Sequence, residues 1–267
     1  MAHSHNDPSL LASYTVGSGG LGTVLLHGFL GSGQNLRTLA NKWAARDPQQ
    51  KFLIPDLLGH GDSPRLAPDC IMDTVAQAVL HTAAHNAIPL PLRIVGHSLG
   101  GRVALACARV APEQVADLVL LDIGPGPIHT ESSETRRVLD VLLQAPERTD
   151  NRRTLHAFFT SHGLSSALAD WILMNLRPHD GGYQWRVDRE ALDRLHTTFT
   201  SDDLWPVVAA QVVPVHVALG ERSTYVSQAD ADRLRALGCD VKVFAGAGHY
   251  VHVDSLGPLL DWLQNLP

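Results

Sequence analysis

The pentapeptide Gly-His-Ser-Leu-Gly at residues 96–100 is the feature that most constrains what this chain can fold into. The apolar run 92–95 before it predicts a buried strand, and the breaker-free, Ala-rich stretch 102–110 after it predicts a helix. A serine at such a strand-to-helix turn, with a glycine two residues away on each side, is typical of a nucleophile elbow. Five common residues can also occur together by chance, but these flanks favour the elbow. Ser98 is therefore a candidate nucleophile.

The rest of the chain alternates apolar strand candidates with helical stretches. The strand candidates are residues 11–16, 23–26, 52–56, 117–122, 215–219 and 240–244, and the helical stretches are 34–46, 69–85, 228–237 and 256–263. This alternation predicts an α/β fold with a mostly parallel central sheet and helices on both faces. The active site of such a sheet lies at the carboxyl ends of its strands, where Ser98, Asp122 and His249 all fall.

A glycine-rich stretch at residues 17–22 matches the dinucleotide-binding pattern G-x-G-x-x-G letter for letter. That fingerprint has to open a helix, whereas residues 23–26 predict a strand. We interpret the stretch as a glycine-rich turn between two strands, and we expect no organic cofactor.

The alternation stops between residues 124 and 205. Helical segments are predicted at 133–144, 152–162, 165–176 and around 190–199, with a short extended piece at 183–187, and seven of the fifteen aromatic residues of the chain lie here. We interpret 124–205 as a helical cap inserted into a core domain formed by 1–123 and 206–267. Most cap aromatics are expected to form the cap's own small core. The candidates for substrate contacts are Phe158 and Trp171 from the cap, with His27 and Tyr250 from the core.

Composition limits the classes of partner. The net charge is −6 and no run of Lys or Arg is present, which argues against a nucleic acid or an anionic membrane surface. Three widely spaced cysteines, Cys70, Cys107 and Cys239, predict free thiols in a reducing compartment and no zinc or other metal site. The amino-terminal residues lack the apolar core of a signal peptide, and no stretch reaches the ~18 apolar residues of a membrane span, so the cytoplasm is the expected location. The oligomeric state is left open.

Four motifs together give the chain a resemblance to the α/β-hydrolase fold superfamily over nearly its whole length. They are His27-Gly28-Phe29, Asp56 with the sequence Gly-His-Gly-Asp-Ser at 59–63, residues 96–101, and Gly248-His249. The resemblance implies Ser98 as nucleophile, His249 as general base and acid, and the backbone N–H groups of Phe29 and Leu99 as the oxyanion hole. It also implies that the inserted helical segment is a lid.

The triad acid departs from the usual superfamily pattern. That pattern expects an Asp three residues past a glycine after the strand 215–219, and this chain has Ser223 there. The sequence looks most like the small bacterial esterase and ABHD11-type subgroup, in which the acid follows the preceding strand, here at Asp122. Glu221 and Asp254 compete for the role. Asp122 is favoured because it ends a rigid apolar strand, while Glu221 sits two positions short and Asp254 is better placed for capping.

The sequence thus predicts a serine hydrolase that cleaves a carboxylic ester or thioester of a small or medium acyl group through an acyl-enzyme. One alternative is a lyase or carbon–carbon bond hydrolase that uses the same Ser-His pair. A second alternative, from a different class, is a non-catalytic receptor that uses the pocket to bind a ligand.

Overall fold

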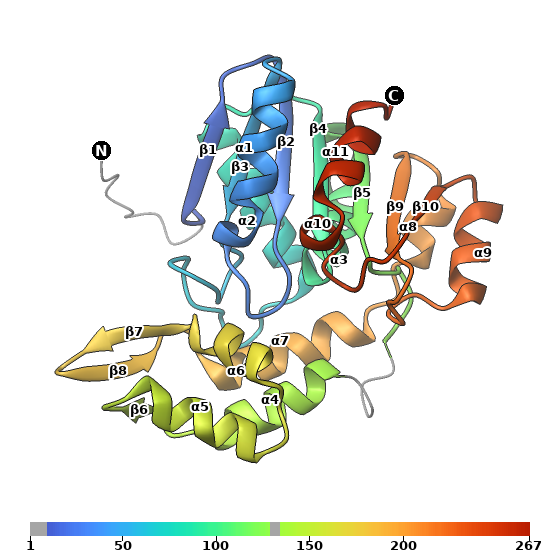
Figure 1. Cartoon of the computed structure of the whole chain (residues 1–267). Coiled ribbons are helices and arrows are strands. Elements are labelled where there is room, and N and C mark those ends of the chain that lie inside the picture. The colour runs from blue at the N-terminus through green and yellow to red at the C-terminus, as the bar shows by residue number, and fades with distance from the viewer. Residues whose placement is uncertain (1–9, 129–133) are drawn as a thin grey trace.

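The computed structural model describes residues 10–128 and 134–267, so residues 1–9, assigned above to the core, and 129–133, assigned to the cap, lie outside the described residues. Its centre is a seven-stranded sheet in the order β1-β3-β2-β4-β5-β9-β10 (Figure 1). The strands are β1 (Ser13–Gly17), β2 (Leu21–Leu26), β3 (Gln50–Pro55), β4 (Leu92–His97), β5 (Val115–Leu121), β9 (Val215–Gly220) and β10 (Asp240–Phe244). Only the pairing of β1 with β3 is antiparallel. The predicted fold class is confirmed.

Helices cover both faces of this sheet. One face carries α2 (Met72–His85), α3 (Leu99–Val110), α8 (Trp205–Ala209) and α9 (Gln228–Ala236), and the other carries α1 (Arg37–Arg46) and α11 (Leu256–Gln264). The two cores follow from strand alternation, because successive side chains of a strand point to opposite faces. In β2, Val24 and Leu26 join the first core and Leu25 joins the second. All three are fully buried, as expected for a strand covered on both sides.

The glycine-rich stretch 17–22 forms the turn that joins β1 to β2, as predicted, but these two strands are not neighbours. Strand β3 lies between them, and the turn crosses over its first residues. The Gly19 N–H donates to the Gln50 carbonyl at 3.2 Å, and a Cβ on Gly19 would lie 1.9 Å from the Gln49 carbonyl oxygen. A side chain cannot be accommodated there, so the glycine serves a close backbone approach and not a phosphate.

The residues 124–205, called the cap segment below, lie across the carboxyl edge of the sheet (Figure 1). Their helices are α4 (Glu134–Gln144), α5 (Arg152–Ser161), α6 (Ser166–Leu173) and α7 (Arg189–Ser201), close to the predicted positions. The segment also holds an antiparallel sheet in the order β6-β8-β7, made of Arg148–Thr149, Gly182–Trp185 and Leu176–His179. The sequence predicts only an extended piece near Tyr183, and its third predicted cap helix wrongly extends through Leu176, the first residue of β7.

Both ends of the cap segment are held by one buried arginine of α3. The Arg102 side chain is fully buried, and its guanidinium donates to the carbonyls of Gly124 and Gly126 at 3.1 and 2.7 Å. It also donates to the carbonyls of Phe199, at 2.6 Å, and Asp202. Burial lowers the pKa of Arg102 to about 10, still far above neutral, so the residue remains a cation. The helix that follows the predicted nucleophile thus also fixes where the cap segment leaves and rejoins the sheet.

No helix in the described ranges 10–128 and 134–267 has both the length and the apolar character needed to cross a membrane.

Candidate active site

Ser98 lies at the sharp turn between β4 and α3. Its backbone has φ +52° and ψ −116°, a conformation that residues other than glycine rarely adopt and that stores strain. The backbone around this turn is closely packed, and only a glycine fits at residue 100, because a Cβ on Gly100 would lie 2.3 Å from the Leu26 carbonyl oxygen. The strand, strained serine and helix predicted from residues 92–110 are therefore present, and Ser98 lines a cavity at the carboxyl edge of the sheet.

Asp122 and His249 lie side by side at the same edge. Asp122 immediately follows β5, is 1% exposed, and its Oδ2 lies 2.8 Å from His249 Nδ1. Asp122 Oδ1 also accepts the Gly220 N–H at 2.9 Å, and the Ser223 hydroxyl donates to Oδ2. Three donors around one buried carboxylate stabilise its negative charge. The bond at Nδ1 leaves the imidazole Nε2 as the nitrogen available to a hydroxyl in the cavity, which His249 also lines.

The competing carboxylates are engaged elsewhere. Glu221 Oε2 accepts the Gly246 N–H at 2.8 Å, and Asp254 Oδ2 accepts the Gly248 N–H at 2.8 Å. Both bonds brace the loop before His249 and neither carboxylate is bonded to its ring. Ser223, which occupies the position where the superfamily pattern expects the acid, has become a donor to Asp122. The sequence marked this departure, but it did not reveal that the serine still contacts the acid.

The His27 side chain orients the loop that carries the Phe29 amide. His27 Nε2 accepts the Leu57 N–H at 2.9 Å, so the proton resides on Nδ1, which donates to the Gly28 carbonyl at 2.8 Å. Burial lowers the pKa of His27 to about 4, which keeps the ring neutral and this tautomer fixed at pH 7. Because the Gly28 carbonyl and the Phe29 N–H share one planar peptide, holding the carbonyl also fixes the direction of the N–H.

The loop and the nucleophile are in contact. A Cβ on Gly28 would lie 3.4 Å from Ser98 Cβ, so the Gly28–Phe29 peptide passes directly beside the serine. The second predicted oxyanion amide belongs to Leu99, the first residue of α3, whose N–H has no acceptor within its own helix. The Gly28–Phe29 peptide and the first amide of α3 therefore both adjoin Ser98.

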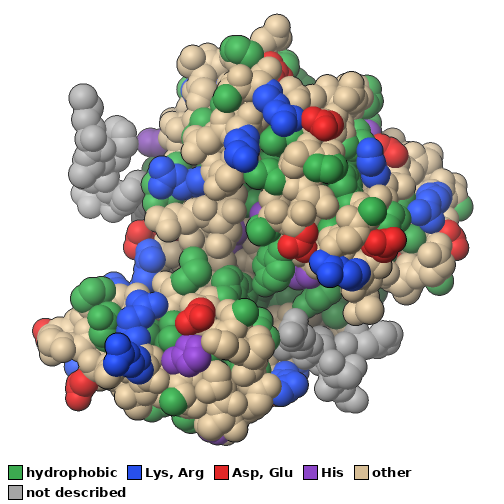
Figure 2. Space-filling view, viewed as in Figure 1, with side chains coloured by type: hydrophobic (Ala, Val, Ile, Leu, Met, Phe, Trp, Pro, Cys, Tyr) green, Lys and Arg blue, Asp and Glu red, His purple; other side chains and the backbone are tan. Residues whose placement is uncertain are grey.

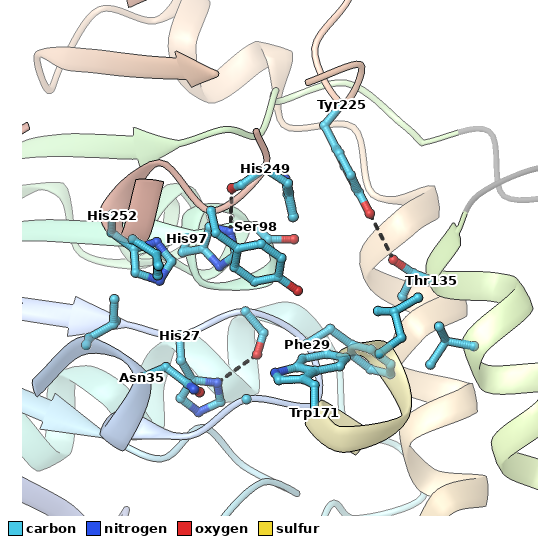
Figure 3. A pocket seen from close by; sticks show the side chains of 17 residues that line it. His27, Phe29, Asn35, His97, Ser98, Thr135, Trp171, Tyr225, His249 and His252 are labelled. Carbon is cyan, nitrogen blue, oxygen red and sulfur yellow. Dashed lines mark hydrogen bonds between the residues drawn. The ribbon is translucent and has the colours of Figure 1, made fainter. Parts of the chain in front are cut away.

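The cavity has a volume of about 220 Å³, and Figure 3 shows the Ser98 and His249 side chains at its wall. Of the four predicted substrate contacts, His27, Trp171 and Tyr250 line it. Phe158 does not: its ring packs within the cap segment against His162 and Phe159, with ring centroids 4.2 and 5.6 Å apart. Aromatic content predicted that some cap residues would face a pocket, but helical periodicity cannot say which face of α5 points toward Ser98.

Three ring-bearing residues that line the cavity, His97, Tyr225 and His252, were not predicted. The Tyr225 ring stacks on the His249 ring at 3.7 Å and an interplanar angle of 15°, and its hydroxyl lies 3.4 Å from Thr135 Oγ1 on α4 (Figure 3). His252 also lines the cavity, next to His97 at a ring distance of 4.6 Å. Burial lowers the pKa of His252 to about 4 and that of His97 well below its usual value, so both rings are neutral at pH 7.

The hollow around the cavity is apolar, and charged side chains of both signs surround it. In the space-filling view, hydrophobic side chains gather in the hollow between the sheet domain and the cap segment, and cationic and anionic side chains are interspersed around it (Figure 2). Val138, Leu168 and Trp171 contribute apolar lining from the cap segment. Such a cavity binds an apolar group beside the reactive centre.

Comparison with known families decides the relationship. The sequence profile of the alpha/beta hydrolase fold matches residues 24–256. The chain belongs to this family. The match covers the elbow, Asp122, His249 and the cap segment, so the resemblance predicted from the four motifs is confirmed.

Several relatives of this alpha/beta hydrolase are esterases and lipases. It is 28% identical over 249 residues to the sn-1-specific diacylglycerol lipase ABHD11 of Xenopus laevis, covering 91% of this chain and 78% of that protein. It is 29% identical to lipase LipV of Mycobacterium tuberculosis, with 88% of each chain covered. It is 28% identical to esterase YbfF of Escherichia coli, covering 86% of this chain and 87% of that one. These relatives confirm the expected class, a carboxylesterase-type hydrolase.

A solved structure shares the whole architecture. A marine microorganism esterase superposes with a TM-score of 0.84 over 96% of this chain and 99% of its own, at 23% identity. At that identity the likeness shows the fold alone.

Proposed function

We propose that this alpha/beta hydrolase cleaves a carboxylic ester or thioester of a small or medium acyl group through a Ser98–His249–Asp122 triad. The observation that carries the proposal is the 2.8 Å bond between Asp122 and His249 at the wall of the cavity that the strained Ser98 also lines. Asp122 holds the imidazole with its proton on Nδ1, which is the tautomer that a general base requires.

The reaction follows from these contacts. His249 Nε2 takes the Ser98 hydroxyl proton as Oγ attacks the substrate carbonyl carbon, and the oxygen that becomes negative is stabilised by the Phe29 and Leu99 amides. The protonated imidazole then gives its proton to the leaving alcohol or thiol, and an acyl-Ser98 remains. A water molecule repeats the sequence with His249 as base, releases the acid and restores the serine.

The size and lining of the cavity support the substrate class. A volume of about 220 Å³ lies below the usual range of sites for drug-sized ligands, which is about 300–1,000 Å³. The apolar residues Val138, Leu168 and Trp171 suit the hydrocarbon part of an acyl group. The lipase and esterase activities named for the relatives agree with an ester substrate.

Covalent labelling tests the proposal. Incubation with a fluorophosphonate should place one adduct on Ser98, and the Ser98→Ala protein should stay unlabelled and lose ester hydrolysis. A panel of p-nitrophenyl esters and acyl thioesters of increasing chain length should show highest kcat/KM for short or medium chains.

The same experiment separates the alternatives. A folded wild-type protein labelled on Ser98 that turns over no ester or thioester would favour a lyase or carbon–carbon bond hydrolase. Absence of labelling together with binding of a small ligand would favour a receptor. An adduct on another residue would refute the triad.

A further inference from the structure

The loop that carries the Phe29 amide is bent into an unfavourable conformation. The Gly31 N–H donates to the Gly28 carbonyl at 3.0 Å, which closes a tight turn around Phe29 and Leu30. Leu30 has φ +57°, a left-handed backbone that a branched side chain disfavours. Such a turn persists only where surrounding groups hold it in place. From the core, the His27 side chain holds its first carbonyl, that of Gly28.

The cap segment holds a second carbonyl of this turn, that of Leu30. Asn175, between α6 and β7, is 6% exposed, and its Nδ2 donates to the Leu30 carbonyl at 3.0 Å. The two residues are 145 positions apart in the sequence. This bond therefore joins the strained residue of the loop directly to the cap segment.

Asn175 is itself held rigidly. Its backbone N–H donates to the Ile172 carbonyl at 3.0 Å, and its own carbonyl accepts the Arg186 N–H at 2.8 Å. The side-chain Nδ2 also reaches the Ile172 carbonyl at 3.3 Å. With both backbone groups bonded, the amide is preorganised toward Leu30 and little freedom is lost when the bond forms.

The Phe29 ring ties the same loop to a second cap helix. It contacts His196 and Phe199 of α7 at ring distances of 5.6 and 5.9 Å, and His60 of the core at 5.8 Å. The cap segment thus contacts this turn through a carbonyl and a side chain. The Phe29 N–H, which the proposed mechanism uses, directly precedes these two contacts in the chain.

We infer that Asn175 is a positioning residue for the oxyanion hole: it holds the Leu30 carbonyl so that the Phe29 N–H points at the oxyanion. This inference rests on the proposed hydrolase function. It makes the seated cap segment part of the machinery that stabilises the transition state, beyond its part in choosing the substrate. A shift of the amide of about 1 Å is enough to lower the rate about 100-fold.

The test replaces the donor without changing the shape. Asn175→Asp is isosteric and turns a donor toward the Leu30 carbonyl into an acceptor, and Asn175→Ala removes the group. Both variants should lower kcat by about 10- to 100-fold with KM changed less than about threefold, because the bond acts on the transition state and not on substrate binding. Active-site titration with a fluorophosphonate normalises each rate to the competent protein.

A matched control removes a neighbouring bond that does not touch the loop. Arg152 Nη2 donates to the Leu173 carbonyl at 2.8 Å, also at the end of α6. Arg152→Met therefore disturbs the same part of the cap segment and should keep kcat within about threefold of wild type. A merely structural role for Asn175 predicts that the three variants lose activity alike.

A transition-state analogue gives the second readout. A trifluoromethyl ketone forms a hemiketal with Ser98 whose oxyanion occupies the same hole, so its inhibition constant should rise in the Asn175 variants by the factor by which kcat/KM falls. Unchanged kcat and inhibition constants would overturn the inference and leave the triad intact, whereas an active Ser98→Ala protein would overturn the proposed function itself. If both Asn175 variants failed to fold while Arg152→Met folded, the role would be structural and the inference would also be wrong.

Discussion

Lowering the pH from 7.5 to 5.5 should destabilise the folded protein, because the folded protein buries histidines in their neutral form. His27 and His60 are each 1% exposed, and burial lowers their pKa values to about 4 and about 3. His60 additionally has the neighbouring His27, which further opposes protonation. In the unfolded chain both residues return to the ordinary value near 6.5.

The sign and size of the effect follow from these pKa values. Between pH 6.5 and about 4 the unfolded state binds a proton at each site and the folded state does not, so the free energy of unfolding falls as the pH falls. Above about pH 6.5 the two histidines are neutral in both states, so none of this stability is lost there. At pH 5.5, one unit below the unfolded pKa, each histidine has cost about 1.4 kcal/mol, so the pair costs about 3 kcal/mol. Against a typical total of about 5–15 kcal/mol, that loss is readily measured.

Urea denaturation at the two pH values measures the total loss, to which the buried His97 and His252 also contribute, and a variant isolates the share of His60. In His60→Asn the amide can replace the Nδ1–H that faces the Leu58 carbonyl at 3.0 Å, but it cannot titrate. The loss between pH 7.5 and 5.5 should therefore shrink by about 1.4 kcal/mol in His60→Asn. His85→Asn, at the exposed end of α2, should leave it as in wild type. A wild-type pH dependence in His60→Asn would refute the reasoning, whatever the absolute stability of the variant.

The remaining predictions concern catalysis. Asp122→Asn should lower kcat by about 10⁴-fold while keeping the fold, since the amide favours the wrong His249 tautomer. The kcat of Glu221→Gln should stay near that of wild type, and reversed phenotypes in steady-state kinetics would transfer the acid role to Glu221. Trp171→Ala should change the ratio of kcat/KM between short and longer acyl esters by about 10- to 200-fold, because Trp171 lines the cavity. Phe158→Ala should change kcat/KM by the same factor for all substrates. Equal ratios in both variants would contradict the assignment of Trp171 to substrate choice.

The parts of the fold that were predictable depend on short-range signals. Parallel strands covered on both faces must be nearly continuous apolar runs, and Leu92, Ile94, Val95 and residues 118–121 are fully or almost fully buried in the structure. The elbow is likewise local, because the strain at Ser98 and the close approach of Gly96 to the Gly100 carbonyl oxygen, 2.2 Å from where a Cβ on Gly96 would lie, arise within five residues of sequence. Asp122 and His249 could be placed at one edge because parallel strands all end there. Whether the two side chains meet at that edge then depends only on the order of the strands in the sheet.

The small cap sheet was missed although one local signal was present. Asp180 and Gly181 join β7 to β8 with φ +44° and +81°, the pair of left-handed residues that a two-residue hairpin turn requires. Asp-Gly is among the strongest hairpin signals, but the flanking strands are only four residues each and mostly polar. Without an alternating apolar pattern, the helical pattern before them was extended through Leu176.

Contacts between distant residues were beyond the sequence for a different reason. An asparagine between a helix and a strand gives no sign of the carbonyl it will meet 145 residues away. Nothing in the sequence says that Trp171 of α6 faces the cavity while Phe158 of α5 packs within the cap segment. Residue type limits the chemistry of a side chain but does not name its partner. Ser223 shows the same limit: the sequence marked its position as unusual, and only the structure gave its bond to Asp122.

Under the proposed mechanism, the attachments of the cap segment join substrate choice to catalysis. Helix α3 begins beside the strained Ser98, supplies the Leu99 amide in its first turn, and in its next turn carries Arg102, which binds the carbonyls at both ends of the cap segment. The far side of the cap segment bonds the Leu30 carbonyl through Asn175. A cap segment fixed to the helix of the nucleophile at one end, and to the oxyanion loop at the other, cannot shift as a body without moving one side of the site against the other. Since packed elements resist small deformations, the position that shapes the apolar lining also determines the alignment of the two amides.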